Sequence, residues 1–254
     1  MFYCIGITEK GIMSHNEDAL LINREVIDSG ESEQNINAPF IAAVSDGVSS
    51  ERSGELASKM CLEMVRDLNI DDVEGLESGL LDIHKKMADH SRSDPETHNM
   101  QATLCGVAVD SNRKITTFNA GDSRLYRFRQ GKLRQISKDQ SLVQLLYEEG
   151  SITMEERKTH VHRHIIFPVF GNVKSDPKVD MIQLDGMEYG DVLLLCTDGL
   201  SDSVSPLDIE AVLEYPEPLK DRLEKLVKQA LDKGCKDNIT VIAIVYYEDE
   251  EKGG

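Results

Sequence analysis

The sequence predicts an α+β fold in which β-sheets and helices form separate layers. Strand-like segments come in clusters, helical segments come in pairs, and no strict strand–helix–strand alternation runs along the 254 residues. Strict alternation is typical of a doubly wound parallel sheet, whereas clustered strands favour a sheet that carries helices on its outer face. We therefore expect a layered sandwich rather than a doubly wound sheet.

Five short apolar runs indicate buried strands, because they are too short for helices and rich in strand-forming residues. These runs are Phe40–Val44, Thr103–Val109, Ile115–Phe118, Val192–Cys196 and Ile239–Val245. A hairpin is expected where Ser123–Arg129 and Lys132–Ile136 are joined by Gln130-Gly131, since glycine suits the tight turn of a hairpin.

Three helices are expected from apolar residues that recur at intervals of three and four. The apolar stripes are Ala57, Met60, Cys61, Met64, Val65 and Leu68 in the first, Leu76, Leu80, Ile83 and Met87 in the second, and Leu219, Leu223, Leu226, Val227, Ala230 and Leu231 in the third. Two segments, residues 29–37 and the acidic tail 248–254, are expected to be exposed and without regular structure.

Charge and composition exclude several classes of protein. The chain has 28 Lys and Arg against 46 Asp and Glu, a net charge of −18. Such a surface repels polyanions, so binding to nucleic acid is not expected, whereas metal cations are attracted. No apolar run approaches the roughly 20 residues of a membrane helix, and no leading signal segment is seen. The five cysteines are widely spaced inside apolar runs, so a reduced protein of the cytoplasm is expected.

Acidic residues stand at the ends of predicted strands. Asp46-Gly47 and Asp198-Gly199 each follow an apolar run, and Asp237 precedes the last one. A single Asp-Gly at a strand end is usually only a turn. Two matched copies, together with Asp237 and the acidic pair Glu17-Asp18, indicate instead that the fold directs several carboxylates toward one point.

Carboxylates that share a cavity repel one another and take up protons unless a cation compensates them. A ligand set made only of oxygens, without His or Cys, selects hard ions such as Mg²⁺ or Mn²⁺. Two such ions about 3.5–4 Å apart stabilise the attacking and leaving oxygens of phosphoryl transfer and activate a water. The residues alone thus indicate a metal-dependent phosphohydrolase.

Five motifs, in this order, resemble those of the protein phosphatase 2C family. They are Asn16-Glu17-Asp18, Ser45-Asp46-Gly47, Gly121-Asp122-Ser123-Arg124, Asp198-Gly199-Leu200 and Asp237-Asn238-Ile239-Thr240. The match runs from about Gly6 to Val245, and the segment of about residues 138–172 is similar to the flap of the bacterial branch. The resemblance implies a four-layer αββα sandwich, with a central β-sandwich flanked by antiparallel helix pairs, as a single phosphatase domain over residues 1–254.

The resemblance also implies hydrolysis of phosphoserine and phosphothreonine in proteins by a water that two Mg²⁺ or Mn²⁺ ions activate. Asp46 falls on the family's bridging ligand, and the Gly47 carbonyl on a ligand of the second metal. Asp198 and Asp237 would complete the first metal site. These residues form the expected binuclear centre.

Further residues carry roles that the resemblance implies. Glu17 and Asp18 would hold metal-bound waters, and Asp18 would orient the nucleophile. Bacterial members bind a third, looser metal at the position of Asp122, shared with Asp198. The alternative for Asp122 is a turn residue that pairs with Arg124.

Two departures from the family pattern affect the expected substrate contacts. Met13 stands where the family commonly has an arginine that binds the substrate phosphate, so phosphate binding is expected to depend more on the metals, aided by His15 or Arg52. Val48 stands where many animal members have a histidine that acts as a candidate general acid. A metal-bound water is therefore expected to protonate the leaving oxygen.

The expected partners are phosphoprotein substrates of a serine/threonine kinase, with no nucleic acid and no membrane, and the expected enzyme is a monomer. One alternative is an enzyme of the same fold that acts on a single regulatory phosphoprotein, which the loss of the arginine at Met13 motivates. Another is a pseudo-enzyme that binds phosphoproteins without hydrolysis. The complete carboxylate set argues against the pseudo-enzyme, because a degenerate site usually loses a ligand.

Overall fold

The computed structural model describes residues 1–48, 53–93 and 97–247. Its strands are β1 (Phe2–Glu9), β2 (Asp18–Ile22), β3 (Glu25–Ile27), β4 (Gly30–Ile36), β5 (Phe40–Val48), β6 (Gln101–Ala102), β7 (Leu104–Val109), β8 (Ile115–Ala120), β9 (Arg124–Arg129), β10 (Lys132–Gln135), β11 (Asp180–Leu184), β12 (Val192–Cys196) and β13 (Ile239–Tyr246). Its helices are α1 (Ser53–Val65), α2 (Val73–Ser93), α3 (Leu142–Glu148), α4 (Met154–Thr159), α5 (Asp198–Ser201), α6 (Pro206–Glu214) and α7 (Leu219–Asp232).

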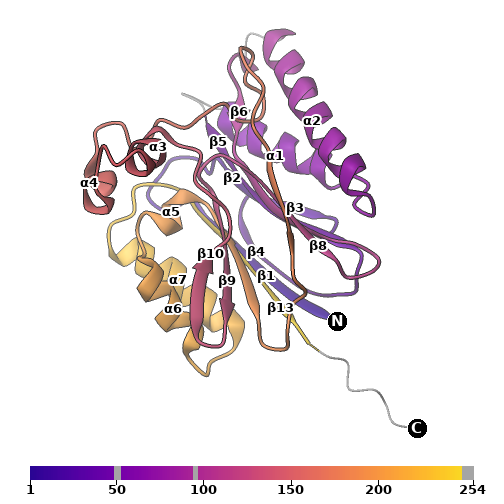
Figure 1. Cartoon of the computed structure of the whole chain (residues 1–254), viewed down its shortest axis with the longest axis vertical. Helices are drawn as coiled ribbons and strands as arrows, with labels where there is room; N and C mark the ends of the chain where they lie inside the picture. Colours follow the sequence, from indigo (N-terminus) through magenta and orange to yellow (C-terminus); the bar gives the residue numbers. More distant parts are fainter. Residues whose placement is uncertain (49–52, 94–96, 248–254) are drawn as a thin grey trace.

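The strands form two stacked antiparallel sheets (Figure 1). Over the described residues one sheet has the order β10-β9-β12-β13-β1-β4, and the other has the order β11-β8-β7-β5-β2-β3 with β6 paired to β5. Helices α1 and α2 cover the outer face of the second sheet, and α6 and α7 cover the outer face of the first. This arrangement confirms the predicted α+β class and its αββα layers.

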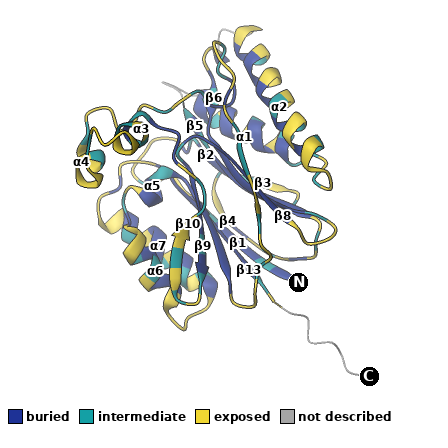
Figure 2. Ribbon diagram, in the orientation of Figure 1, coloured by how far each residue is buried: buried dark blue, intermediate teal, exposed yellow. Residues whose placement is uncertain are grey.

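Three apolar layers hold the sandwich together, and β12 shows why its sequence is apolar throughout. Leu193 and Leu195 face the layer between the sheets, whereas Leu194 and Cys196 face α6 and α7. Because side chains alternate along a strand, a strand buried on both faces needs an unbroken apolar run. Figure 2 shows the same division, with buried strands in the middle and with α1, α2, α6 and α7 exposed on the faces that point away from the sheets.

The five predicted strands, the hairpin and the three predicted helices are all present, with ends shifted by a few residues. The prediction that residues 29–37 lack regular structure was wrong. They contain β4, which pairs with β1 along seven positions, from Phe2 opposite Ile36 to Thr8 opposite Gly30. The strand lies at a sheet edge, so its many polar residues face water, while Ser32 and Ile36 are buried.

The segment 138–172, for which a flap is expected, contains α3 and α4 and then returns to its start. Ile166 forms a bridge with Ser141, and the Phe167 amide donates to the Gln140 carbonyl at 2.9 Å. Figure 1 shows the two helices projecting at one side of the sandwich. The acidic tail 248–254 lies outside the described residues. Within them, no helix is both long and apolar enough to span a membrane.

Candidate metal centre

Asp18 and Asp46 lie directly opposite each other on the neighbouring strands β2 and β5. The Asp46 amide donates to Thr103 Oγ1 at 3.0 Å, and the Thr103 amide donates back to the Asp46 carbonyl at 2.8 Å. Asp18 is 2% exposed and accepts a hydrogen bond from Thr197 Oγ1 at 2.8 Å. Like charges directly opposite on a sheet are destabilising, so this pairing requires a compensating feature of the site.

The other sheet brings Asp198 and Asp237 to the same end of the sandwich. Asp198 begins α5 two residues after the last residue of β12, and Asp237 lies two residues before β13, the strand paired with β12. Thr197 joins the two sheets here, because its hydroxyl donates to Asp18 of β2 and accepts from the Thr240 amide at 3.1 Å. Each sheet therefore contributes one Asp-Gly pair to the site.

The glycine of each Asp-Gly pair permits close packing of backbone on backbone. A Cβ on Gly47 would lie 2.0 Å from the Gly54 carbonyl oxygen at the start of α1, and a Cβ on Gly199 would lie 1.8 Å from the Asn238 carbonyl oxygen. Real side chains do not tolerate such distances. The second contact places Asp198 beside the loop that carries Asp237.

Asn238 fixes the loop of residues 10–17 between β1 and β2. Its Nδ2 donates to the carbonyls of Lys10 and His15, each at 3.0 Å, and its Oδ1 accepts from the Glu17 amide at 2.8 Å. Sequence reasoning gave no role to Asn238 or to Thr197, although both stand next to predicted ligands. The signal that could have revealed them is their polar character next to the ends of buried strands.

The carboxylates perturb one another strongly. Burial raises the pKa of Asp18 to about 7, with repulsion from Asp237 and Glu17 adding to the shift. Burial likewise raises the pKa of Glu17 to about 7. The pKa values of Asp46 and Asp198 lie well above their usual range, first because of burial and then because of nearby carboxylates. The acids that act on Asp46 are Asp18, Asp198, Asp122 and Asp237.

Asp122 lies where the chain crosses from one sheet to the other, between β8 and β9. Gly121 has a φ of +115°, in the region that favours glycine, and this turns the chain into the crossing. Burial raises the pKa of Asp122 to about 7, and Asp139 adds to the shift. Arg124 forms an ion pair with Asp139 at 2.6 Å, and its charge also opposes the rise in the pKa of Asp122. The alternative role of Asp122, as a turn residue that pairs with Arg124, stays a prediction.

Of the two residues expected to contact the substrate phosphate, the structure describes only His15. His15 is exposed, and its carbonyl is held by Asn238 beside Asp237. Met13 is 41% exposed in the same loop. Arg52 lies outside the described residues. The roles assigned to His15 and Arg52 therefore stay predictions.

The donor set fits a hard divalent ion by its chemistry. Among the described residues, no three His, Cys, Asp or Glu side chains are already arranged to ligate one ion. The strand ends nevertheless bring Asp18, Asp46, Asp198 and Asp237 to one end of the sandwich, and the pKa of Asp46 is raised by burial and by these acids and Asp122. Such a group attracts a cation, and its donors are all oxygens, as Mg²⁺ and Mn²⁺ prefer.

The layered αββα sandwich, with carboxylates clustered at one end, indicates a metal-dependent phosphatase. Comparison with known proteins identifies its family. The family described as protein phosphatase 2C matches residues 25–239. The chain belongs to this family, and with it to the metal-dependent protein phosphatases.

Relatives come from several bacteria. The serine/threonine phosphatase stp of Listeria monocytogenes is 30% identical over 247 residues, which cover 93% of each chain. The crystal structure of the Mycobacterium tuberculosis serine/threonine phosphatase PstP/Ppp is 28% identical with a TM-score of 0.80, over 98% of this chain and all of that one. The catalytic domain of PstP in complex with two manganese ions is 27% identical with a TM-score of 0.78, over 98% and 100% of the two chains.

Proposed function

We propose that this enzyme removes phosphate from phosphoserine and phosphothreonine in proteins phosphorylated by a serine/threonine kinase, using two Mg²⁺ or Mn²⁺ ions. The observation that carries the proposal is the set of mutually repelling, partly buried carboxylates around Asp46, which bound cations would balance. The names of the relatives support the substrate class, and the relative crystallised with two manganese ions supports the metal.

The chain's own groups have distinct roles in this proposal. Asp46, whose pKa responds to acids from both sheets, would bridge the two ions. Asp198 and Asp237 would complete one ion site, and the Gly47 carbonyl would contribute to the other. When bound, the ions supply positive charge to the substrate phosphate and activate a water. Asp18, fixed by Thr197 Oγ1, would orient the attacking water, and Glu17 would hold further water.

A covalent route through cysteine is disfavoured by the surroundings of the thiols. All five cysteines are buried. Burial raises the pKa of Cys196, the thiol at the end of β12, to about 12. A thiol with such a pKa stays protonated at neutral pH and is a poor nucleophile. Attack by water is therefore the proposed route.

A third ion is proposed at the corner formed by Asp122 and Asp198. After burial, Asp122 is the first cause that raises the pKa of Asp198, which supports a short distance between the two carboxylates. Asp202, which sequence reasoning did not single out, also acts on both. We include it in the proposed third site.

The proposal is tested by hydrolysis of p-nitrophenyl phosphate and of a phosphothreonine peptide with Mn²⁺, with and without a chelator. Wild-type activity should depend on Mn²⁺, and Asp198→Asn should lower kcat about a thousandfold, because it weakens a metal ligand. Asp232→Asn, at the exposed end of α7, is the matched control and should keep full activity. Mn²⁺ binding without phosphate release by the wild-type protein would support the pseudo-enzyme instead.

A further inference from the structure

A cavity of about 280 Å³ lies at the β11 edge of the sandwich, between β7, β8 and β11 of one sheet and β9 of the other. Cys105, Leu125 and Ile136 line it, and all three belong to or pack against the apolar layer between the sheets. Ile182 of β11 also lines it and is 41% exposed, so the cavity reaches the protein surface. The apolar layer therefore ends here in an open hollow.

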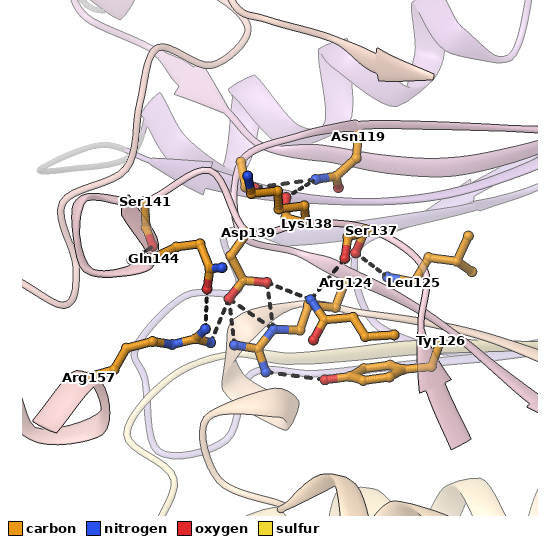
Figure 3. A network of polar contacts seen from close by, with 12 residues as sticks. Asn119, Arg124, Leu125, Tyr126, Ser137, Lys138, Asp139, Ser141, Gln144 and Arg157 are labelled. Carbon is orange, nitrogen blue, oxygen red and sulfur yellow. Dashed lines mark hydrogen bonds and ion pairs between the residues drawn. The ribbon is translucent and has the colours of Figure 1, made fainter. Parts of the chain in front are cut away.

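The wall of this cavity holds one buried polar group that is only half used. Asn119 of β8 is 4% exposed, and its Nδ2 donates to the carbonyls of Gly121 at 3.4 Å and Lys138 at 3.3 Å. Figure 3 shows the Asn119 amide joined to Lys138. Two carbonyl partners determine which end of the amide carries the nitrogen. The other end, Oδ1, is buried and has no hydrogen-bond partner among the residues that the structure describes.

An acceptor buried in this way loses its contact with water and gains nothing in return. A bound molecule that donates a hydrogen bond to Asn119 Oδ1 would remove that cost. The adjacent amide of Gln140 shows the contrast, because both of its ends are used. Its Oε1 accepts from the Gly121 amide at 3.1 Å, and its Nε2 donates to the Lys178 carbonyl at 3.0 Å and to Asp180 Oδ2 at 2.9 Å.

Charges at the cavity are balanced by ion pairs. Lys138 pairs with Glu148 at 2.7 Å, and Lys178 pairs with Asp180 at 2.7 Å. Both lysine side chains are mostly exposed, so their pairs lie in water at the rim. Because each cation has an acidic partner, the cavity favours a neutral molecule over an ion. The volume is slightly below the roughly 300–1,000 Å³ of sites for drug-sized ligands, so the molecule is small.

We propose that this cavity is a binding site for a small, neutral ring compound with one hydrogen-bond donor. The ring would lie against the apolar wall, and the donor would bond to Asn119 Oδ1, which sets the orientation of the ring. Side chains of the wall also hold both backbone groups of Gly121, the residue before Asp122. A bound ring would thus lie next to the loop that carries a proposed metal ligand. The inference itself does not depend on the proposed phosphatase function.

The test uses two probes of nearly identical shape, indole and benzofuran, of which only indole has an N–H. In heteronuclear NMR of isotope-labelled protein, indole should shift the side-chain amide signals of Asn119 and the backbone amide signal of Ile182 in a saturable manner. A dissociation constant of about 1 mM is expected for so small a ligand. Benzofuran should bind roughly tenfold more weakly, because it leaves Asn119 Oδ1 without a partner.

Matched variants locate the site independently of the probes. Ile182→Trp should fill the cavity and remove the saturable indole shifts, whereas Gln183→Trp should keep them, because neighbouring residues of β11 point to opposite faces. Thermal unfolding checks that both variants fold, and Ile182→Phe replaces Ile182→Trp if the larger ring is not accepted.

Three outcomes would each overturn the inference. They are equal affinity for indole and benzofuran, the absence of saturable indole shifts at Asn119, and unchanged indole binding in the filled variant. Binding of indole with the predicted preference over benzofuran, lost in the filled variant and kept in Gln183→Trp, would support it.

Discussion

Two groups of buried acids lie close together in this protein and are balanced in opposite ways. Asp139 is surrounded by cations, since Arg124 and Arg157 both donate to its carboxylate. Asp46 is surrounded by other carboxylates, which raise its pKa further above the value that burial gives it. The first arrangement is complete within the chain. The second is not, and it is the one we assign to metal binding and catalysis.

The contrast shows how a structural carboxylate differs from a functional one. A buried charge with its full set of partners stabilises a particular arrangement of the chain, and removing one partner leaves the other uncompensated. A buried charge among like charges is kept at a cost in stability, which a bound ion offsets. Substitutions in the two groups should therefore have opposite effects on the metal-free protein.

Replacing Asp139 should give the largest change in stability. Asp139→Ala leaves the Arg124 side chain, only 10% exposed, without its ion pair, so the free energy of unfolding should fall by about 3–5 kcal/mol. Urea unfolding followed by circular dichroism measures this change. Asp82→Ala is the control, because its ion pair with Lys85 is exposed on both sides and should be worth less than about 1 kcal/mol. If Asp139→Ala and Asp82→Ala lower the free energy of unfolding by equal, small amounts, the ion pairs of Asp139 do not stabilise the fold as proposed.

The acidic cluster should make the chelated protein less stable as pH rises. The pKa values of Asp18 and Asp122 are raised from 3.8 to about 7, so the folded protein binds more protons than the unfolded chain between these values. Stability from this source is fully present below about pH 4 and is lost as pH rises through about 7, by at most about 1.4 kcal/mol per pH unit for each group. Calorimetry in chelator should therefore show a lower Tm at pH 8 than at pH 5.5.

Net charge also opposes stability at high pH, so this prediction needs matched variants. Asp46→Asn removes the most strongly surrounded acid and should reduce the pH dependence of Tm in chelator, whereas Asp82→Asn, which is exposed, should leave it nearly unchanged. Added Mn²⁺ should stabilise the wild type more at pH 8 than at pH 5.5, because protons compete with the metal. If Tm in chelator depends on pH equally in Asp46→Asn and Asp82→Asn, the effect comes from net charge alone.

The sequence predicted the layers of this fold because its strands are apolar runs and its helices carry apolar stripes. It did not predict β4, since Glu31, Glu33 and Asn35 are polar and only pairing with β1 makes their segment a strand. Local sequence carries no record of such long-range pairing.

For the site, the Asp-Gly pairs at Asp46 and Asp198 were visible because strand ends are marked by turn residues. The network that places them was not visible. Thr197 and Asn238 contact residues about two hundred positions away, and Arg157 pairs with Asp139 across the flap. Such partners are set by tertiary structure, so spacing along the chain does not reveal them.

The smallest expected effect on activity comes from Met13→Arg, which adds a cationic side chain beside the acidic site. Met13 lies in the loop that Asn238 holds next to Asp237, and the Met13 amide donates to the Lys10 carbonyl at 3.2 Å. Met13→Arg should lower KM for p-nitrophenyl phosphate up to about tenfold, because a guanidinium can bind two phosphate oxygens at once. Ile12→Arg is the control, because it adds the same charge in the same loop, at a residue that is 74% exposed. If both variants lower KM equally, the gain comes from general attraction of an anion to a less negative surface. If only Met13→Arg lowers KM, position 13 faces the substrate phosphate, and an arginine there supplies the cation that the acidic site lacks.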